Sequence, residues 1–593
     1  MSQEEAYSIR LAGETSIGNG VVYYTERYIS DGKYCSDIYC FDGINRVRIT
    51  HEGNARSPQF QDGTLYYVRF TEDNETLMVL SGLSEPVVLA RFRKIRKYLP
   101  IEGKMLIIAE EGAEKSEPFY ARDLKYRFNG AGLLRKRPSL YVVDGSGKCT
   151  MIYGGNFDVE DVQYGGRRII IQTTENEDSI GLSDLYEISE EGKKIGRITK
   201  EPMRINSYAV SGSGRIALSG HDGYTPWELN RIIFPESGES VMAGNDSSDS
   251  VLSDLFWSFP MRMKFVEDIL YTIGQVNGSS YLYEISGLNA QKISEESGKI
   301  LNFDVYDNGQ SRDIAYIIST SEKPCIMHYR NTLDINPDVK GQAPEVFSMD
   351  GGEVFFLLRS KNSPTVVSIH GGPQTAYGQN YSIEFQFLLN NGFNVLYTNP
   401  PGSTGYGAEY TKKCAGDWGN LDFEFIQKAI RMVKGKYGLV ESFAVTGGSY
   451  GGYMTNWIVS HSDIFKCAIS ERSISNLLSM VGTSDIGFWF NTIQLNVSDP
   501  FSEEGIRKLM EYSPISFAKR VKAPVLLITG EEDYRCPIEQ AEQFFVALKM
   551  NGVEAELIRY QGDNHEHARA GVPKNMLDRL KRKKEWFEKY LIK

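Results

Sequence analysis

The hydrophobic pattern divides the chain into two regions with different periodicities. Before about residue 335, short aromatic and β-branched runs are separated by Gly, Asp and Asn, as in strands joined by tight turns. From about residue 336, short apolar runs alternate with segments whose apolar residues recur at helical spacing. We therefore predict an all-β domain over residues 1–335 and an α/β domain over residues 336–593.

A loose repeat runs through the first region. An aromatic strand recurs at intervals of roughly 40 residues, the size of a β-propeller blade. Its copies centre on residues 20–24, 63–68, 105–109, 168–172, 215–218, 268–273 and 315–318. This spacing predicts a β-propeller of about seven blades. Because the copies resemble one another only weakly, a pair of irregular β-sandwiches is the alternative.

In the second region, predicted strands alternate with predicted helices. Strands are expected at 365–369, 394–398, 443–446, 465–469, 524–529 and 554–560, and helices at 383–390, 421–436, 450–460, 537–550 and 574–591. Such alternation is typical of a mostly parallel, doubly wound sheet with helices on both faces.

One motif in this region indicates a nucleophile. The segment Gly447-Gly448-Ser449-Tyr450-Gly451 matches G-x-S-x-G. The match is weak evidence in a chain with 57 glycines, but here a predicted strand precedes the motif and a predicted helix follows it. Such a sharp turn needs flanking residues without side chains and lifts the serine above the strand ends. We predict that Ser449 is the nucleophile of an α/β-hydrolase domain; a Gly-rich turn with an idle serine is the alternative.

A serine hydroxyl needs a base, and this fold places its triad in the order Ser, Asp, His. His565 follows the last predicted strand, where the fold needs its histidine, and His567 is the competing residue. Asp533 follows the strand before it and is the predicted orienting acid, with Glu532 as the alternative. The expected triad is therefore Ser449, Asp533 and His565.

A second glycine-rich segment is the candidate oxyanion hole. His370-Gly371-Gly372-Pro373 directly follows the strand 365–369. The fold takes one donor from this loop and the other from the residue after the nucleophile. We assign the oxyanion donors to the backbone N–H groups of Gly372 and Tyr450; a plain glycine turn is the alternative.

Together these segments resemble the prolyl oligopeptidase family of serine peptidases, most closely its acylaminoacyl peptidase branch. The resemblance covers the C-terminal half and rests on residues 370–373, 399–407 (NPPGSTGYG), 447–453 (GGSYGGY), 533–537 (DYRCP) and 565–573. Residues 126–130 (YRFNG) are similar to a propeller segment of that branch. The resemblance implies an N-terminal propeller that caps the hydrolase domain. It also implies that Arg535 binds a substrate backbone carbonyl; a surface arginine is the alternative.

The resemblance further implies a serine peptidase for short peptides, because a propeller above the site would exclude folded proteins. We expect release of N-acylated amino acids or short N-terminal units through an acyl-enzyme. A dipeptidyl aminopeptidase-like peptidase and a carboxylesterase for small acyl esters are the alternatives. The motif by which dipeptidyl peptidases of the family bind a free amino terminus is not found in the sequence. Residues 482–490 are expected to form an apolar S1 pocket, or part of the core.

Charge and cysteine content narrow the range of partners. The net charge of −12 argues against a nucleic-acid partner. The seven cysteines are scattered and odd in number, which does not suit a disulfide framework. The beginning of the sequence has no apolar signal core, and no apolar run approaches the length of a membrane span. We expect a cytoplasmic enzyme without a cofactor, metal or membrane association; a homo-oligomer is compatible with the sequence.

Overall fold

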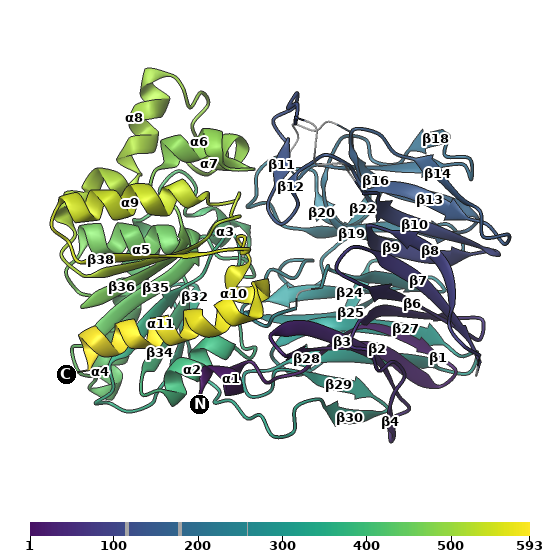
Figure 1. Ribbon diagram of the computed structural model, residues 1–593, viewed down its shortest axis with the longest axis horizontal. Coiled ribbons are helices and arrows are strands. Elements are labelled where there is room, and N and C mark those ends of the chain that lie inside the picture. The colour runs from purple at the N-terminus through teal and green to yellow at the C-terminus, as the bar shows by residue number, and fades with distance from the viewer. Residues whose placement is uncertain (83, 113–117, 176–180, 258, 593) are drawn as a thin grey trace.

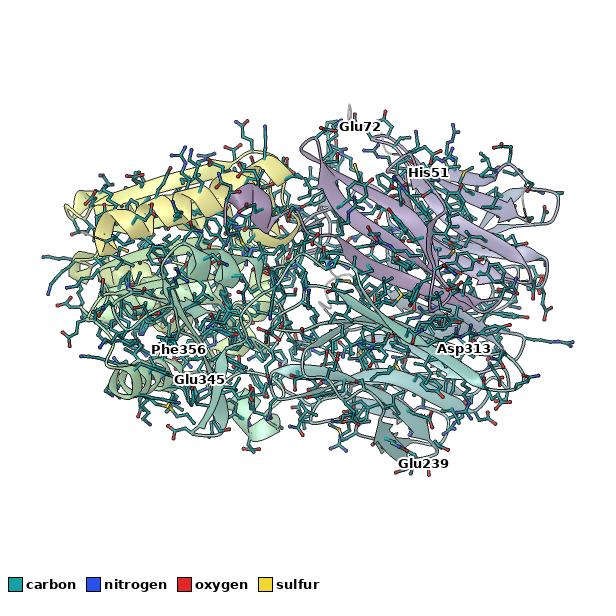
Figure 2. All side chains as sticks on the ribbon, turned by 90° about the horizontal axis from the view of Figure 1, so that it is seen from below. His51, Glu72, Glu239, Asp313, Glu345 and Phe356 are labelled. Atoms are coloured by element: carbon teal, nitrogen blue, oxygen red, sulfur yellow. The ribbon has the colours of Figure 1, made fainter. Side chains whose placement is uncertain are left out.

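The computed structural model of the protein describes residues 1–82, 84–112, 118–175, 181–257 and 259–592. It consists of a fan of β-sheets beside a layered α/β body (Figure 1). In the perpendicular view, Glu72, His51, Asp313 and Glu239 lie around the fan, and Glu345 and Phe356 lie in the α/β body (Figure 2). Within these ranges, no helix is long and apolar enough to cross a membrane.

Seven four-stranded antiparallel sheets form the fan in the described ranges, which confirms a seven-bladed propeller over the sandwich alternative. The first three blades are β1–β4 (Leu11–Gly18, Val21–Ser30, Lys33–Phe41, Arg46–Arg48), β5–β8 (Ala55–Gln61, Thr64–Phe70, Glu75–Ser81, Val87–Phe92) and β9, β10, β13 and β14 (Lys94–Ile101, Lys104–Glu110, Ser139–Val143, Cys149–Tyr153). A small hairpin, β11 (Arg127–Phe128) and β12 (Gly132–Leu133), is inserted into the third blade.

The other four blades follow in chain order. They are β15–β18 (Asp158–Gly165, Arg168–Thr174, Asp184–Ile188, Lys194–Arg197), β19–β22 (Arg204–Val210, Ile216–His221, Arg231–Phe234, Glu239–Val241), β23–β26 (Met263–Val266, Ile269–Val276, Ser279–Ser286, Asn289–Lys292) and β27–β30 (Lys299–Asp307, Arg312–Ser319, Ile326–Tyr329, Asn331–Asp334). The last blade meets the first through side chains: Asn302 Oδ1 accepts hydrogen bonds from the Thr15 N–H and hydroxyl at 3.0 and 2.8 Å.

The strands around which the sequence repeat centres are the second strands of the blades. Four of these strands, β10, β16, β20 and β24, are buried on both faces, and β20 is buried along its whole length. A strand buried on both faces appears in sequence as a continuous apolar run. The outermost strands give a weak signal because solvent covers them, as in the fully exposed β18.

The α/β body is built on one eight-stranded sheet in the order β31-β32-β34-β33-β35-β36-β37-β38. Its strands are β31 (Glu345–Met349), β32 (Gly352–Leu357), β33 (Thr365–Ile369), β34 (Asn394–Asn399), β35 (Phe443–Ser449), β36 (Cys467–Ser473), β37 (Val525–Gly530) and β38 (Ala555–Tyr560). All pairs from β34 to β38 are parallel, which confirms the predicted sheet. The antiparallel edge of β31 and β32 was not predicted.

Helices cover both faces of this sheet (Figure 1). They are α2 (Ile383–Asn390), α3 (Ala408–Lys412), α4 (Leu421–Tyr437), α5 (Tyr450–His461), α6 (Leu477–Thr483), α7 (Gly487–Gln494), α8 (Glu503–Glu511), a 3-10 turn (Pro514–Arg520), α9 (Ile538–Met550), α10 (His567–Ala570) and α11 (Pro573–Leu591). The five predicted helices correspond to α2, α4, α5, α9 and α11. The sequence pattern did not predict α6, α7 and α8, which form the insertion above the sheet.

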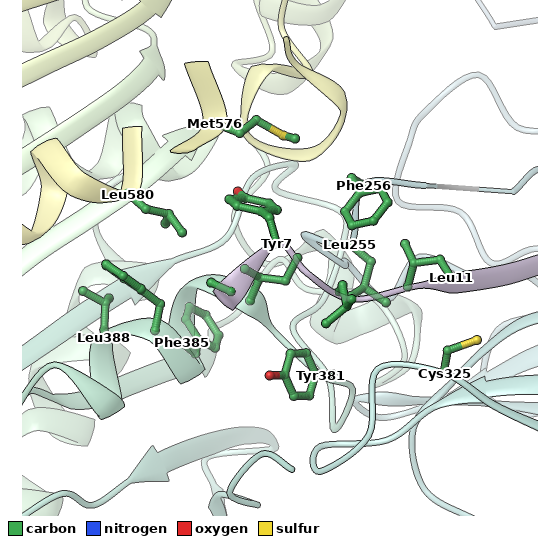
Figure 3. Close-up of a cluster of buried hydrophobic side chains, with 14 of the residues drawn as sticks. Tyr7, Leu11, Leu255, Phe256, Cys325, Tyr381, Phe385, Leu388, Met576 and Leu580 are labelled. Atoms are coloured by element: carbon green, nitrogen blue, oxygen red, sulfur yellow. The ribbon is translucent and has the colours of Figure 1, made fainter. Parts of the chain in front are cut away.

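The beginning of the chain joins the two bodies. Helix α1 (Gln3–Ala6) lies against α2 and α11, and the chain then enters the first blade. Tyr7 is buried in a cluster with Phe256 from the propeller and with Phe385 and Met576 from the α/β body (Figure 3). Burial of this apolar surface from both bodies stabilises their contact.

Candidate active site

Ser449 lies at the sharp turn between β35 and α5. Its backbone has φ 63° and ψ −123°, a conformation that costs energy for a residue with a side chain and is typical of a nucleophile elbow. Steric crowding explains why the residues that flank this turn are glycines. A Cβ atom on Gly447 would lie 2.5 Å from the Gly451 carbonyl oxygen, and one on Gly451 would lie 2.1 Å from the Ile369 carbonyl oxygen.

The predicted acid and base lie side by side at the ends of neighbouring strands. Asp533 follows β37, His565 follows β38, and His565 Nδ1 lies 2.8 Å from Asp533 Oδ2. Asp533 is buried, and its Oδ1 accepts the N–H groups of Arg535 and Cys536 at 2.9 Å each. These donors hold the carboxylate toward Nδ1, which leaves Nε2 of His565 for the serine.

Ser449 and His565 line the same cavity, which has a volume of about 300 Å³. In the described part of the chain no hydrogen bond joins their side chains; Ser449 Oγ lies 4.0 Å from the sulfur of Cys536. Catalytic hydrogen bonds are often long without substrate and shorten when it binds. Burial raises the pKa of the Cys536 thiol well above its ordinary value, so Cys536 is a neutral neighbour of the serine.

The two competing residues occupy unsuitable positions. His567 is buried beneath the loop, neither ring nitrogen has a hydrogen-bond partner in the described residues, and burial lowers its pKa well below the ordinary value. Glu532 is exposed, whereas Asp533 points inward. The geometry therefore favours His565 and Asp533.

The loop after β33 lies beside the nucleophile. A Cβ atom on Gly371 would lie 3.4 Å from the Ser449 Cβ, and both Gly371 and Gly372 line the cavity. Gly372 has φ 117°, a conformation for which glycine is strongly preferred. The Tyr450 N–H belongs to the first turn of α5, where helix N–H groups favour negative charge. Gly372 and Tyr450, whose N–H groups are the predicted oxyanion donors, thus both line the cavity that Ser449 lines.

Arg535 lines the cavity as well and is held by an acidic partner that the sequence did not reveal. Its Nε and Nη2 donate to the two carboxylate oxygens of Asp485 at 2.7 and 3.1 Å. The third guanidinium nitrogen, Nη1, has no hydrogen-bond partner within the described ranges and is left for another acceptor. The Arg535 Cζ lies 5.2 Å from the centre of the ring of Phe128, a propeller residue.

The propeller reaches this site through its inserted hairpin. Asn129 Oδ1 accepts the His565 backbone N–H at 3.1 Å, and the Asn129 N–H donates to Asp485 Oδ2 at 2.9 Å. Arg127 donates to the carbonyl oxygen of Thr483. The sequence of residues 126–130 resembles a propeller segment but gives no sign of these contacts.

Residues 482–490, expected to form an S1 pocket or part of the core, contribute to both. Phe490 lines the cavity together with Met480 and Ile486. Phe488 packs against the hydrophobic core of the α/β body. Trp489 lies under Arg204 of the propeller, whose Cζ is 4.5 Å from the indole ring. The cavity therefore has an apolar wall from α6 and α7.

Behind the nucleophile lies a buried cluster of charges that sequence analysis missed. Glu384 of α2 and Glu471 of β36 pair with Arg579 and Lys583 of α11. Arg472, the residue next to Glu471, also lines the cavity. In the described residues, no group of His, Cys, Asp and Glu side chains is arranged to hold a metal ion.

Two family models match the chain. The model described as acylaminoacyl-peptidase, N-terminal beta-propeller domain, matches residues 25–324, and the model described as prolyl oligopeptidase family matches residues 379–593. These matches agree with the resemblance found in the sequence motifs.

Curated relatives match the chain over about two fifths of its length. The uncharacterized peptidase YuxL of Bacillus subtilis (strain 168) is 44% identical over 230 residues, which are 38% of this chain and 35% of that protein. Acylamino-acid-releasing enzyme 1 of Oryza sativa subsp. japonica is 32% identical over 249 residues, 40% of this chain and 31% of that protein. The match thus spans about a third of the length of each relative.

Solved structures show the same fold over the full chain. The acylaminoacyl peptidase of Pyrococcus horikoshii superposes with a TM-score of 0.88 at 23% identity, over 100% of this chain and 98% of that chain. An acylaminoacyl peptidase in complex with Z-Gly-Gly-Phe-chloromethyl ketone gives a TM-score of 0.87 at 24% identity, with the same coverage of both chains. At this identity the likeness concerns the fold.

Proposed function

The chain belongs to the prolyl oligopeptidase family of serine peptidases, and we propose that it hydrolyses short peptides through Ser449, His565 and Asp533. The observation that supports this most is the 2.8 Å contact of His565 with Asp533 in the cavity that Ser449 lines. In the proposed mechanism His565 Nε2 takes the Ser449 proton as the hydroxyl attacks the scissile carbonyl.

The remaining steps use groups next to the serine. The N–H groups of Gly372 and Tyr450 stabilise the oxyanion, an effect that typically amounts to a few kcal/mol per donor. His565 then gives its proton to the leaving amine, and the acyl group stays on Ser449 Oγ. Water, activated by the same histidine, hydrolyses the acyl-enzyme and restores the serine.

We further propose that the substrate carries a blocked amino terminus, as in an acylaminoacyl peptidase. A free ammonium group needs an unpaired carboxylate, and the acidic side chains that line the described cavity all have partners. Asp254 accepts N–H groups at the start of α2, Glu384 and Glu471 pair with Arg579 and Lys583, and Glu566 pairs with Arg569. A charged amine in this cavity would therefore lose hydration without a replacement.

The test is kcat/KM for one P1 residue presented in two ways, as acetyl-Leu-p-nitroanilide and as Ala-Leu-p-nitroanilide. We expect the acetylated substrate to be preferred. Ser449→Ala should lower kcat by several orders of magnitude without changing the melting temperature. Preference for the free amine would identify a dipeptidyl aminopeptidase, and turnover of acyl esters without any turnover of peptides or anilides would identify a carboxylesterase.

A further inference from the structure

The cavity lining contains two chemically different groups of side chains. Met480, Ile486 and Phe490 are apolar and come from the α6–α7 region, whereas Arg472, Glu566 and Arg569 are charged, and the last two come from the α10 segment. Figure 1 shows α6 and α7 at the top of the α/β body and α10 lower down, near the propeller. Ser449 lines the same cavity, so a peptide bound at the serine has both groups of side chains in its binding site.

Arg472 is a charged group without a hydrogen-bond or ion-pair partner among the residues that the structure describes. It is the last residue but one of β36, which pairs with the nucleophile strand β35, and its guanidinium lies against Gly448. A Cβ atom on Gly448 would be 2.8 Å from both Nε and Nη2 of Arg472. The Nε and Nη1 atoms are buried and have no hydrogen-bond partner, and no carboxylate of the described residues forms an ion pair with this arginine.

The neighbouring acids are already neutralised. Glu471 is held by Arg579 and Lys583, and Glu566 pairs with Arg569 at 2.7 Å. Although burial opposes ionisation of Glu566, the cations Arg569 and Arg472 lower its pKa to about 2, so it stays charged and paired. Burial lowers the pKa of Arg472, which is the cost of a cation without a counterion. A guanidinium in this state is complementary to an incoming anion.

The shape of Arg472 indicates which anion. A guanidinium binds a carboxylate through charge-assisted hydrogen bonds, and Nη2 is the Arg472 nitrogen that is not fully buried. When the leaving fragment is a single residue, its C-terminal carboxylate is only a few bonds from the scissile carbonyl. That carboxylate is therefore the substrate anion closest to the reacting serine. Arg472 touches Gly448, the residue before the nucleophile, which places a carboxylate bound there close to the reacting carbonyl.

We propose that Arg472 binds the free C-terminal carboxylate of short peptides, so that the enzyme releases the C-terminal residue or a very short C-terminal fragment. This inference rests on the proposed peptidase function. The peptide bond breaks, the acyl part is transferred to Ser449 Oγ, and the leaving amine takes the proton from His565. The product amino acid departs with its carboxylate from Arg472, and water hydrolyses the acyl-enzyme.

The first test needs no variant. We compare kcat/KM for acetyl-Leu-Ala with a free carboxylate, for acetyl-Leu-Ala-amide, and for acetyl-Leu-p-nitroanilide. The free acid is expected to exceed the amide by at least about tenfold, the range typical of a charge-assisted hydrogen bond. Equal rates for acid and amide, with the anilide turned over, would overturn the carboxylate site and leave the peptidase proposal intact. Failure to turn over any of the three would instead contradict the peptidase function itself.

The second test assigns the effect to Arg472. In Arg472→Gln the acid-to-amide ratio should fall close to one, and Arg472→Lys, which keeps the charge but loses the fork, should restore part of it. Because the ratio compares two substrates on one variant, any loss of folded enzyme cancels. Arg507→Gln removes a positive charge from the surface of α8 and should keep the wild-type ratio. An Arg472→Gln enzyme that still prefers the acid would show that another group binds the carboxylate.

Discussion

The α/β body and the propeller contribute to the same site in different ways. The α/β body supplies the proposed reacting groups from strand ends: Ser449 after β35, Asp533 after β37 and His565 after β38. The propeller supplies the β11–β12 hairpin, which contacts the histidine loop and the partner of Arg535. One domain therefore supplies the proposed reacting groups, and the other contacts the loops that carry them.

This division follows from the two architectures. The carboxyl ends of parallel strands meet at one edge of a sheet, so loops far apart in sequence converge there whatever else the protein contains. A propeller has no such edge, and its hairpin reaches the site only because the two bodies pack together. Asn129 lies 436 positions from the histidine whose backbone it binds.

The largest effect is expected within the α/β body. Asp533→Asn should lower kcat by about 10⁴-fold with little change in folding, because the amide favours the wrong imidazole tautomer. Steady-state kinetics on acetyl-Leu-p-nitroanilide measure this. Glu532→Gln, one position away on an exposed side chain, is the matched control and should behave as wild type. The reverse outcome would reassign the triad to Glu532.

The next largest effect is expected where the two bodies meet, at Arg535. Removing its guanidinium in Arg535→Ala should raise KM by about tenfold or more, because one hydrogen bond from a charged donor to the substrate is lost. Arg535→Lys should recover little, since Asp485 holds two nitrogens of the fork and an ammonium cannot serve both partners in the same geometry. A variant with unchanged KM would mean that Arg535 serves only to bind Asp485.

A smaller effect is expected from the propeller side. Asn129→Ala removes the acceptor of the His565 N–H and should lower kcat by about tenfold with little change in KM, because the base is less well positioned. Asn129→Asp keeps an acceptor oxygen and should retain most of the activity. If Asn129→Ala changes KM and leaves kcat intact, the hairpin contacts the substrate and does not position the base.

The smallest expected effect is on stability, and it depends on pH. Burial raises the pKa of Asp422, which accepts the Tyr450 hydroxyl, to about 6 from 3.8. The folded state therefore binds the proton more tightly, and this term makes the free energy of unfolding fall by up to about 3 kcal/mol as the pH rises from about 4 to 6.

The Asp422→Asn variant should lack this pH-dependent contribution to the free energy of unfolding. Urea unfolding of both proteins at several pH values between 4 and 7 measures the difference, with the exposed Asp463→Asn as control. A constant difference between wild type and Asp422→Asn across this range would contradict the assignment.

The sequence by itself determined the parts whose causes are local. A nucleophile elbow needs glycine at positions 447 and 451 because carbonyl oxygens leave no room for a side chain there. The second strand of four blades is buried on both faces and so appears as an apolar run. The alternation of strands and helices predicted the parallel sheet and, with it, the order of Ser449, Asp533 and His565.

Only the tertiary structure decided the contacts between segments that carry no mutual signal. The short apolar runs of β31 and β32 did not specify an antiparallel edge until they paired with β34. The choice of Asp485 as the partner of Arg535 depends on where α6 and α7 pack. The position of Arg472 depends on a glycine of the neighbouring strand, since the guanidinium fits only where Gly448 has no side chain. Such juxtapositions depend on the packing of whole elements, and no local pattern of residues records them.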